Sequence, residues 1–384
     1  AALNGVSMNM ARAVGPAIGG VVVAATNAGA VFIANAVSFV GVMGVLSWWK
    51  RPPQESALGA EHVTHAIRVG TRFVRHSPRL RSVLTRTLSF CLFSSALWAL
   101  LPVVAHDRLG LGSGGYGVLL AAVGIGAVAG AFALASARAR WSADHVVAAA
   151  TLAFVVVALV LAWSRSTALD AAVLLVGGAS WISVLSSFNA SAQVALPAWV
   201  RARGMATYLL VFQGGQAAGS IAWGTLATHT STAIALTVVA GGMAGGLLFS
   251  SRRHKLAAGV TMDMTPVSPW GDPELSMEPD PHRPVLVTIE YRVEPENHDA
   301  FRDAMQRLGR SRRRTGAERW SLYQDAADPD RFVENYLVDS WEEHMRQHYE
   351  RQTASDVSIQ QRALDLTVDK TPPPAQHLIF AYEG

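Results

Sequence analysis

Eight stretches of about 20 mostly apolar residues follow one another through the first 250 residues of the chain. A helix rises 1.5 Å per residue, so about 20 such residues cross the apolar core of a bilayer. The pattern therefore predicts eight membrane-spanning helices. They lie near residues 4–26, 29–49, 82–105, 115–137, 144–164, 169–190, 205–227 and 232–250.

The loops between these stretches differ in charge. If the first stretch starts on the cytoplasmic side, the inside loops carry 14 Lys and Arg residues, and the outside loops carry only Arg108 and Arg165. Because basic loops remain on the cytoplasmic side, this bias predicts that both ends of the chain are cytoplasmic. In the longest inside loop, HVTHAIRVGTRFVRHSPRL (residues 62–80) predicts an amphipathic helix on the inner membrane surface.

After residue 250 the pattern changes. Residues 251–283 are rich in proline and predict a linker. Residues 284–384 then give short strands and helices in the order βαββαβ with one extra short helix, which predicts a small α+β domain of ferredoxin-like type. Sheets of this kind in two copies of a chain often pack together, so we expect a homodimer through residues 284–384. The membrane domain is expected to cover residues 1–250.

Charge separates the same two parts. Residues 1–250 hold 15 Lys and Arg against 5 Asp and Glu, and residues 251–384 hold 17 against 23. The basic excess lies between apolar runs, so it fits membrane topology, and we expect no nucleic-acid partner. A single cysteine, Cys91, excludes an intramolecular disulfide and a cysteine-based metal site.

An internal repeat appears when the chain is shifted by 204 residues. The shift aligns Asn9 with Gln213, Arg12 with Gln216, Gly15 with Gly219 and Gly20 with Gly224. Six spans separate the aligned elements, and parallel repeats of six helices indicate a twelve-helix transporter. The first span here would then be helix 5, and helices 1 to 4 are expected to precede it.

Only one arginine, Arg12, lies well inside an apolar span. A charge at that depth costs roughly 2.5–3.5 kcal/mol, so Arg12 is expected to face a polar cavity, although it could instead reach the cytoplasmic interface. The small residues around it allow close helix packing, and the proline bends the helix. This packing motif comprises Gly15, Pro16, Gly19 and Gly20.

Other polar and aromatic residues in the spans are candidates for the same cavity. Trp181 is a further candidate that could stack on a ligand, and the alternative for each tryptophan is core packing. The expected cavity residues are Asn9, Arg12, Trp98, Asn189, Gln193, Gln213 and Gln216. No Asp or Glu lies well inside a predicted span. A carboxylate proton relay would then have to lie in helices 1 to 4.

In the second part, His344 and His348 are spaced by one helical turn beside Trp341. That spacing can bind a metal, but no third ligand is evident, so we expect no metal and no cofactor. The residues are interpreted as a solvated, pocket or dimer-interface group. The basic run at Arg310 and 312–314 is interpreted as a solvated helix end.

Three motifs, NMARAVGPAIGG, AIRVGTRFVRHSPRLRSVL and LPAWVRARGMATY, resemble the major facilitator exporters of the enterobactin-exporter and macrolide-efflux type, the transmembrane secretion effectors. The resemblance implies that residues 1–250 correspond to helices 5–12 of a twelve-helix major facilitator fold. GPAIGG resembles the helix 5 motif of proton-coupled exporters, which implies efflux. Residues 284–384 are similar to dimeric αβ-barrel domains of antibiotic-biosynthesis monooxygenases.

These observations together predict a multi-pass protein of the bacterial inner (plasma) membrane with a cytoplasmic C-terminal domain. We expect proton-coupled export of a small amphipathic molecule, such as a siderophore or an antibiotic, by alternating access. The expected partners are this small-molecule substrate and the lipid bilayer. The alternative is a membrane-anchored enzyme, or a dimerisation or regulatory module, whose activity lies in the monooxygenase-like domain.

Overall fold

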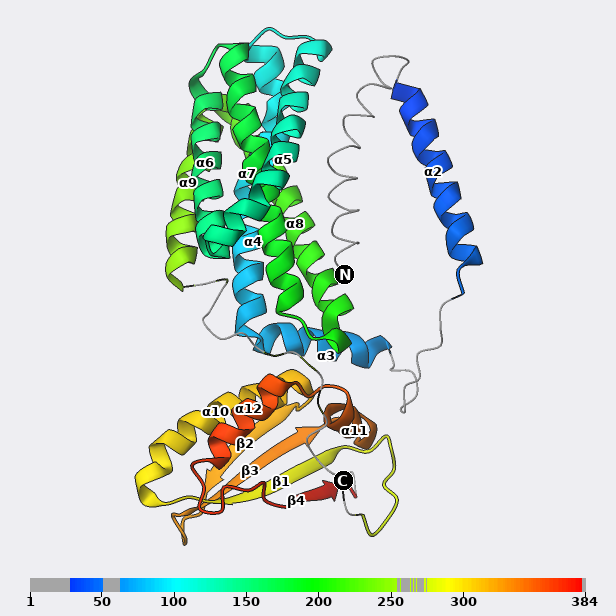
Figure 1. The fold of residues 1–384 in the computed structure, drawn as a ribbon, viewed down its shortest axis with the longest axis vertical. Coiled ribbons are helices and arrows are strands. Elements are labelled where there is room, and N and C mark those ends of the chain that lie inside the picture. The colour runs from blue at the N-terminus through cyan, green and yellow to red at the C-terminus, as the bar shows by residue number, and fades with distance from the viewer. Residues whose placement is uncertain are drawn as a thin grey trace. The chain divides into compact units, whose positions relative to one another are not determined.

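The computed structural model describes residues 28–50, 63–253 and 275–381, with single residues between the last two ranges (Figure 1). They form two compact units. The membrane unit takes its described residues from 28–50, 82–191 and 209–256, and the αβ unit takes its own from 63–81, 192–208 and 263–381. The expected boundaries at 250 and 283 stay a prediction.

Helices make up the described part of the first 253 residues. They are α2 (Ala28–Trp48), α3 (Val63–His76), α4 (Pro78–Val103), the π-helical turn η1 (Val104–Arg108), α5 (Ser113–Arg140), α6 (Ala143–Trp163), α7 (Thr167–Val194), the 3-10 turn η2 (Ala198–Val200), α8 (Arg201–His229) and α9 (Thr232–Arg253).

Five of the described helical segments are long and apolar enough to cross a membrane, where the sequence predicted eight. They are Pro78–Arg108, Gly114–Arg140, Ala143–Trp163, Thr167–Val194 and Thr232–Ser250. The expected span 4–26 lies outside the described residues. Helix α2 forms as expected over Ala28–Trp48, and its apolar segment among the described residues is Phe32–Trp48. Helix α8 forms over 205–227, yet its glutamine, serine and histidine residues lower its hydropathy.

Helix α4 is a packing centre of the membrane unit because glycines on two other helices lie directly against it. A Cβ atom at Gly219 of α8 would overlap the carbonyl oxygen of Leu92, and one at Gly242 of α9 would overlap the Phe93 ring. Helices α5 and α7 cross in the same way, with Gly126 of α5 against the backbone of Leu175. Glycine is therefore needed at these positions for the helices to approach so closely.

The C-terminal elements confirm the predicted βαββαβ order. They are β1 (Val285–Arg292), the 3-10 turn η3 (Pro295–Asn297), α10 (His298–Thr315), β2 (Arg319–Gln324), β3 (Arg331–Val338), α11 (Trp341–Tyr349), α12 (Ala354–Leu364) and β4 (Ala375–Ile379). Ser340 caps α11 as expected, because its side chain accepts a hydrogen bond from the Glu343 amide at 3.1 Å.

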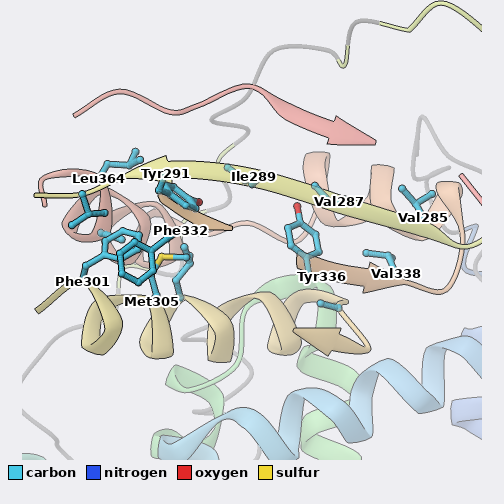
Figure 2. Packing of buried hydrophobic residues seen from close by; sticks show 14 of the residues in the cluster. Val285, Val287, Ile289, Tyr291, Phe301, Met305, Phe332, Tyr336, Val338 and Leu364 are labelled. Atoms are coloured by element: carbon cyan, nitrogen blue, oxygen red, sulfur yellow. The ribbon is translucent and has the colours of Figure 1, made fainter. Parts of the chain in front are cut away.

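The four strands form one antiparallel sheet in the order β2-β3-β1-β4, the strand order of a ferredoxin-like fold. Every second residue of β1 from Val285 to Tyr291 is buried, and these side chains face the core between the sheet and the helices. Figure 2 shows this core, with Phe301 and Met305 of α10 beneath β1 and β3. The helices α10 and α12 lie on the same side of the sheet (Figure 1).

Helix α3 is part of the αβ unit, where it packs against α10. Its Arg72 donates to the carbonyl oxygen of Gly316 at 2.6 Å and to the carboxylate of Glu318 at 3.0 Å. Arg68, one turn earlier, donates to Asp339 at 3.3 Å. The polar face of the predicted amphipathic helix therefore binds protein carboxylates. Its location on the membrane surface stays a prediction.

Candidate functional site

An aromatic cluster joins three helices inside the membrane unit. The rings of Trp98 on α4 and Trp181 on α7 lie 5.5 Å apart between centroids, at an interplanar angle of 72°. Phe90 of α4 lies 5.8 Å from Trp181, and Phe212 of α8 lies 6.4 Å from it. Aromatic contacts of this kind offer a large, flat apolar surface to a ligand as well as to the core.

Two polar atoms of this region are buried without a hydrogen-bond partner among the described residues. They are the indole nitrogen Nε1 of Trp98 and the amide oxygen Oε1 of Gln216. By contrast, Nε1 of Trp223 donates to the Leu92 carbonyl oxygen at 2.6 Å. A buried polar group without a partner is costly, so the two unpaired atoms indicate a place where another molecule or chain segment supplies the hydrogen bond.

Helix packing fixes the position of Gln216. Gly215 and Gly219, one helical turn apart on α8, are both buried and both lie against α4. Gln216 follows Gly215 directly, so its side chain leaves α8 beside the face that contacts α4. Gly219 is the position that the 204-residue shift aligns with Gly15, and its equivalent Gly15 lies outside the described residues.

Charged groups also lie within the membrane unit, and sequence reasoning missed two of them. Arg86 on α4 is 3% exposed and forms an ion pair with Asp144 at the start of α6. Asp170, in the first turn of α7, is 0% exposed, and its carboxylate lies near the Ser164 hydroxyl and the Arg108 guanidinium. The sequence indicated only that Asp170 stands near the end of a span, which does not reveal its burial.

The predicted cavity residues are only partly located. Asn9, Arg12, Gly15, Pro16, Gly19 and Gly20 lie outside the described residues. The structure brings Trp98 and Trp181 together as expected for stacking. Asn189 is half-buried on α7, while Gln193 and Gln213 are exposed in the described structure. Their role in a cavity stays a prediction.

A second candidate site is a cavity of about 490 Å³ in the αβ unit. It lies between the sheet and the helices, and residues of both layers line it. They include Tyr291 of β1, Tyr336 of β3, Arg312 of α10, His344 and His348 of α11, and His377 of β4. Of the predicted group, His344 and His348 line the cavity, and Trp341 packs on His344 at 5.6 Å between ring centroids.

A buried carboxylate organises one wall of this cavity. Glu334 on β3 is 0% exposed and accepts hydrogen bonds from Tyr291 at 2.8 Å, from Trp320 at 2.8 Å and from Arg312 at 3.3 Å. The guanidinium of Arg312 also lies over the Tyr336 ring, 5.1 Å from its centroid. One positive and one negative charge thus meet within a set of hydrogen bonds, so the wall has no net charge.

The interpretation of the basic run as a solvated helix end is wrong for two of its members. Arg312 is 2% exposed because it turns inward to Glu334, and Arg314 is 7% exposed because it forms an ion pair with Asp356 at the start of α12. The interpretation of the histidines as solvated is also wrong. His344 is 2% exposed and His348 is 5% exposed.

Burial determines the charge of His344. Loss of solvent lowers its pKa to about 3, and the nearby His377 and His348 lower it further in the same direction. The imidazole is therefore neutral near pH 7. The Gln347 side chain lies beside the ring and acts on the pKa in the opposite direction. Among the described residues, no cluster of three His, Cys, Asp or Glu side chains has the arrangement of a metal site.

The membrane-spanning helices and the attached antiparallel sheet define a multi-pass membrane protein that carries an α+β domain. Residues 1–383 match the transmembrane secretion effector family, and the chain belongs to this family of membrane transporters of the major facilitator type. The resemblance in the three sequence motifs is thereby confirmed.

No curated protein matches the chain. A solved structure, a putative antibiotic biosynthesis monooxygenase from Nitrosomonas europaea, is similar to it at 21% sequence identity and a TM-score of 0.22. The similarity covers 28% of this chain and 95% of that one. The ferredoxin-like fold of the αβ unit follows from its own strand order.

Proposed function

We propose that this transporter exports a small amphipathic molecule, such as a siderophore or an antibiotic, by alternating access driven by a proton gradient. It would act in the bacterial inner membrane with its αβ unit in the cytoplasm. Family membership supports transport, and the basic loops support the orientation. Arg12 would bind an anionic group of the substrate or act as a gate.

One observation carries the substrate class. In the membrane unit, unpartnered Nε1 of Trp98 and Oε1 of Gln216 occur in helices that also contribute to the aromatic cluster around Trp181. A ligand that satisfies the two polar atoms needs hydrogen-bonding groups, and a ligand that contacts the rings needs an apolar or aromatic body. Both properties together describe an amphipathic molecule.

Transport can be tested with the full-length natural protein in everted membrane vesicles. A catecholate siderophore, a macrolide and a fluorescent amphipathic dye would be offered in turn, with a pH gradient, acidic inside, as the energy source. Accumulation of at least one compound that collapses when an ionophore dissipates the gradient is expected. Equal accumulation in vesicles with and without the protein, for all three compounds, would contradict the proposal.

Variants then test the site. Trp98→Phe removes the indole N–H but keeps an aromatic ring, and Gln216→Leu removes the amide; each is expected to reduce transport about tenfold, because one hydrogen bond to the substrate is lost. Trp223→Phe and Thr228→Ala are matched controls on the same bundle and should retain transport. Arg12→Ala in the full-length protein is expected to abolish export without reducing its abundance.

Proton coupling is proposed to involve Asp170, because it is a buried carboxylate of the membrane unit that lies near the Ser164 hydroxyl and the Arg108 guanidinium. Asp170→Asn should remove the dependence of transport on the pH gradient while leaving downhill counterflow of the same compound intact. Asp107→Asn is the control, since the Asp107 side chain is 62% exposed. Identical loss of gradient-driven and downhill transport would show that Asp170 is structural.

The alternative places the activity in the αβ unit, as an enzyme or as a dimerisation or regulatory module. The cavity of about 490 Å³ favours some role for this unit beyond anchoring. Light scattering of the full-length protein in detergent would give its mass as a monomer or a dimer. A substitution that fills this cavity and leaves transport unchanged would show that the role of the αβ unit is separate from transport.

A further inference from the structure

A groove runs along the membrane unit between three of its helices, α5, α6 and α7. Its volume is about 640 Å³, and its lining extends from Ile125 in the middle of α5 to Trp141 just after the end of that helix. Of the 17 residues that line it, 11 are glycine, alanine or serine. Their short side chains leave open the space that larger side chains would fill.

Helix packing explains why this groove stays open. Two glycines of α5 lie against α7, because a Cβ atom at Gly126 would overlap the carbonyl oxygen of Leu175 and one at Gly130 would overlap Ala179. Helix α6 packs instead against α9. Because α5 is held on α7 and α6 on α9, the space between α5 and α6 is bordered by small side chains, with residues of α7 as its floor.

The groove is long and narrow. Its lining on α5 runs from Ile125 to Ala137, a rise of about 18 Å, which exceeds the roughly 15 Å apolar depth of one leaflet. The volume spread over this length gives a mean cross-section of about 36 Å². A helix about 10 Å wide needs roughly 80 Å². The groove therefore admits a hydrocarbon chain but not a helix.

The chemistry of the groove also fits hydrocarbon. Apart from the small residues, its lining consists of Ile, Leu, Val and Trp side chains. The hydroxyl of Ser183 donates to the carbonyl oxygen of Ala179 on its own helix at 2.7 Å. A water molecule needs two to four polar partners to stay in a cavity, and an empty groove would forfeit the dispersion contacts of its lining. The lipid that surrounds a membrane-spanning unit supplies a chain that restores these contacts.

One end of the groove has groups that attract a lipid headgroup. Trp141 lines this end and is 57% exposed, as is typical of tryptophans at a membrane interface. Arg140, the preceding residue, is also exposed. The bias of the basic loops predicts that this loop is cytoplasmic, and basic side chains on that side attract anionic phospholipids.

We propose that this groove binds one acyl chain of an anionic phospholipid from the cytoplasmic leaflet, with the phosphate of the headgroup at Arg140. The bound lipid would fill the space between α5 and α6 and so act as a structural part of the membrane unit. The site depends on the membrane location of these helices. It does not depend on which compound is exported or on the driving ion.

The test uses the full-length protein in nanodiscs that contain a trace of phosphatidylglycerol with a photoreactive diazirine in one acyl chain. Phosphatidylcholine with the same labelled chain is the neutral probe. Label is read peptide by peptide, and label on α9, which does not line the groove, measures contact with bulk lipid. Peptides of the groove are expected to take up about fivefold more label from phosphatidylglycerol than from phosphatidylcholine, because one arginine attracts its headgroup.

Substitutions make the result specific to the groove. Ala133→Leu on α5 and Ala149→Leu on α6 each place a larger side chain in the groove from an exposed position, and each should remove most of the groove label. Ala135→Leu is the matched control, because Ala135 is an exposed alanine of α5 that does not line the groove. The size-exclusion profile verifies that each variant is folded.

A second pair of substitutions tests the headgroup. Arg140→Gln should make the groove label from the two lipids nearly equal, because the attraction to the anionic headgroup is lost. Arg165→Gln is the control, since Arg165 is exposed and is predicted to lie on the opposite side of the membrane. An unchanged preference for phosphatidylglycerol in Arg140→Gln would overturn the assignment of the headgroup to this end of the groove.

The remaining outcomes concern the occupant. Groove label that prefers phosphatidylglycerol, is lost in the two filling variants and is kept in Ala135→Leu supports the lipid site. Equal label on the groove and on α9, unaffected by Ala133→Leu, would mean contact with bulk lipid only and overturns it. Strong label on α9 with none in the groove would mean that another segment of the chain or a second copy covers the groove, which also overturns it.

Discussion

Arg312 on α10 and Glu334 on β3 form an ion pair inside the αβ unit, with side chains that are 2% and 0% exposed. Removing one partner of such a pair leaves the other charge buried and uncompensated. Glu334→Gln keeps the side-chain shape and should lower the opening free energy of β1 and β3 by about 3–5 kcal/mol. Hydrogen exchange of the full-length protein measures this quantity.

A matched control exists on the same sheet. Glu290 pairs with Arg331 at 2.7 Å, but these side chains are 47% and 39% exposed. Solvent screens such a pair, so Glu290→Gln should change the opening free energy by less than about 1 kcal/mol. Equal losses for the two substitutions would contradict the importance of burial.

Acid should weaken the αβ unit through His344. Its pKa is about 3 in the folded protein and 6.5 when solvated, so below pH 6.5 the unfolded state binds a proton that the folded state does not. Stability is therefore expected to fall by about 1.4 kcal/mol per pH unit as the pH drops from 6.5 toward 3. The groups that face this ring are His377 of β4, His348 of α11 and Arg312 of α10.

The measurement is the opening free energy of β1 amides at pH 7, 6 and 5, corrected for intrinsic exchange. His344→Phe has no proton to gain, so its slope over this range should be shallower by the same amount. An identical slope in the variant would show that other groups control the acid sensitivity.

Close packing of α8 on α4 predicts a sharp difference between two glycines. Gly219→Ala introduces a methyl group that overlaps the Leu92 carbonyl oxygen and should destabilise the membrane unit by about 1–3 kcal/mol. Gly224 of the same helix has nothing within 4 Å of a Cβ atom, so Gly224→Ala should be neutral or slightly stabilising. Thermal unfolding in detergent, followed by size exclusion, ranks the two.

Attachment of α3 to the αβ unit depends on Arg72. Arg72→Glu places a negative charge beside Glu318 and Asp339 and should increase hydrogen exchange along α3 about tenfold or more. The reciprocal change Glu318→Arg in the same chain should restore part of the protection. Arg75→Glu, at an exposed position of the same helix, is the control. Failure of the double variant to recover would indicate that the carbonyl of Gly316 is the essential partner.

Apolar length and strand alternation were enough to predict five of the eight spans and the βαββαβ order, because both depend on local pattern. The buried ion pair between Arg312 and Glu334 was harder to predict, because the two residues lie on different elements of the chain. The pattern did contain a clue: Glu334 lies between Phe332 and Tyr336 at inward positions of β3. Arg312 likewise follows Phe301, Met305 and Leu308 on the buried face of α10. Two opposite charges on facing apolar surfaces indicate a buried pair.

The buried polar groups of the membrane unit were not predictable in the same way. Burial of Asp170 and the lack of a partner for Trp98 depend on how several helices meet, which the spacing within one helix does not determine. The 204-residue shift drew attention to α8, where Gly219 is a contact glycine and Gln216 has an unpaired oxygen.

The guanidinium groups of Arg68 and Arg72 are occupied by carboxylates of the αβ unit. The sequence predicts that α3 lies on the inner membrane surface, where anionic phospholipids attract basic side chains. If α3 lies there, the same donors cannot serve both partners at once, so lipid headgroups and the domain would compete for α3. A membrane richer in anionic lipid would then loosen the domain, and the bilayer would act as an effector of the protein it surrounds.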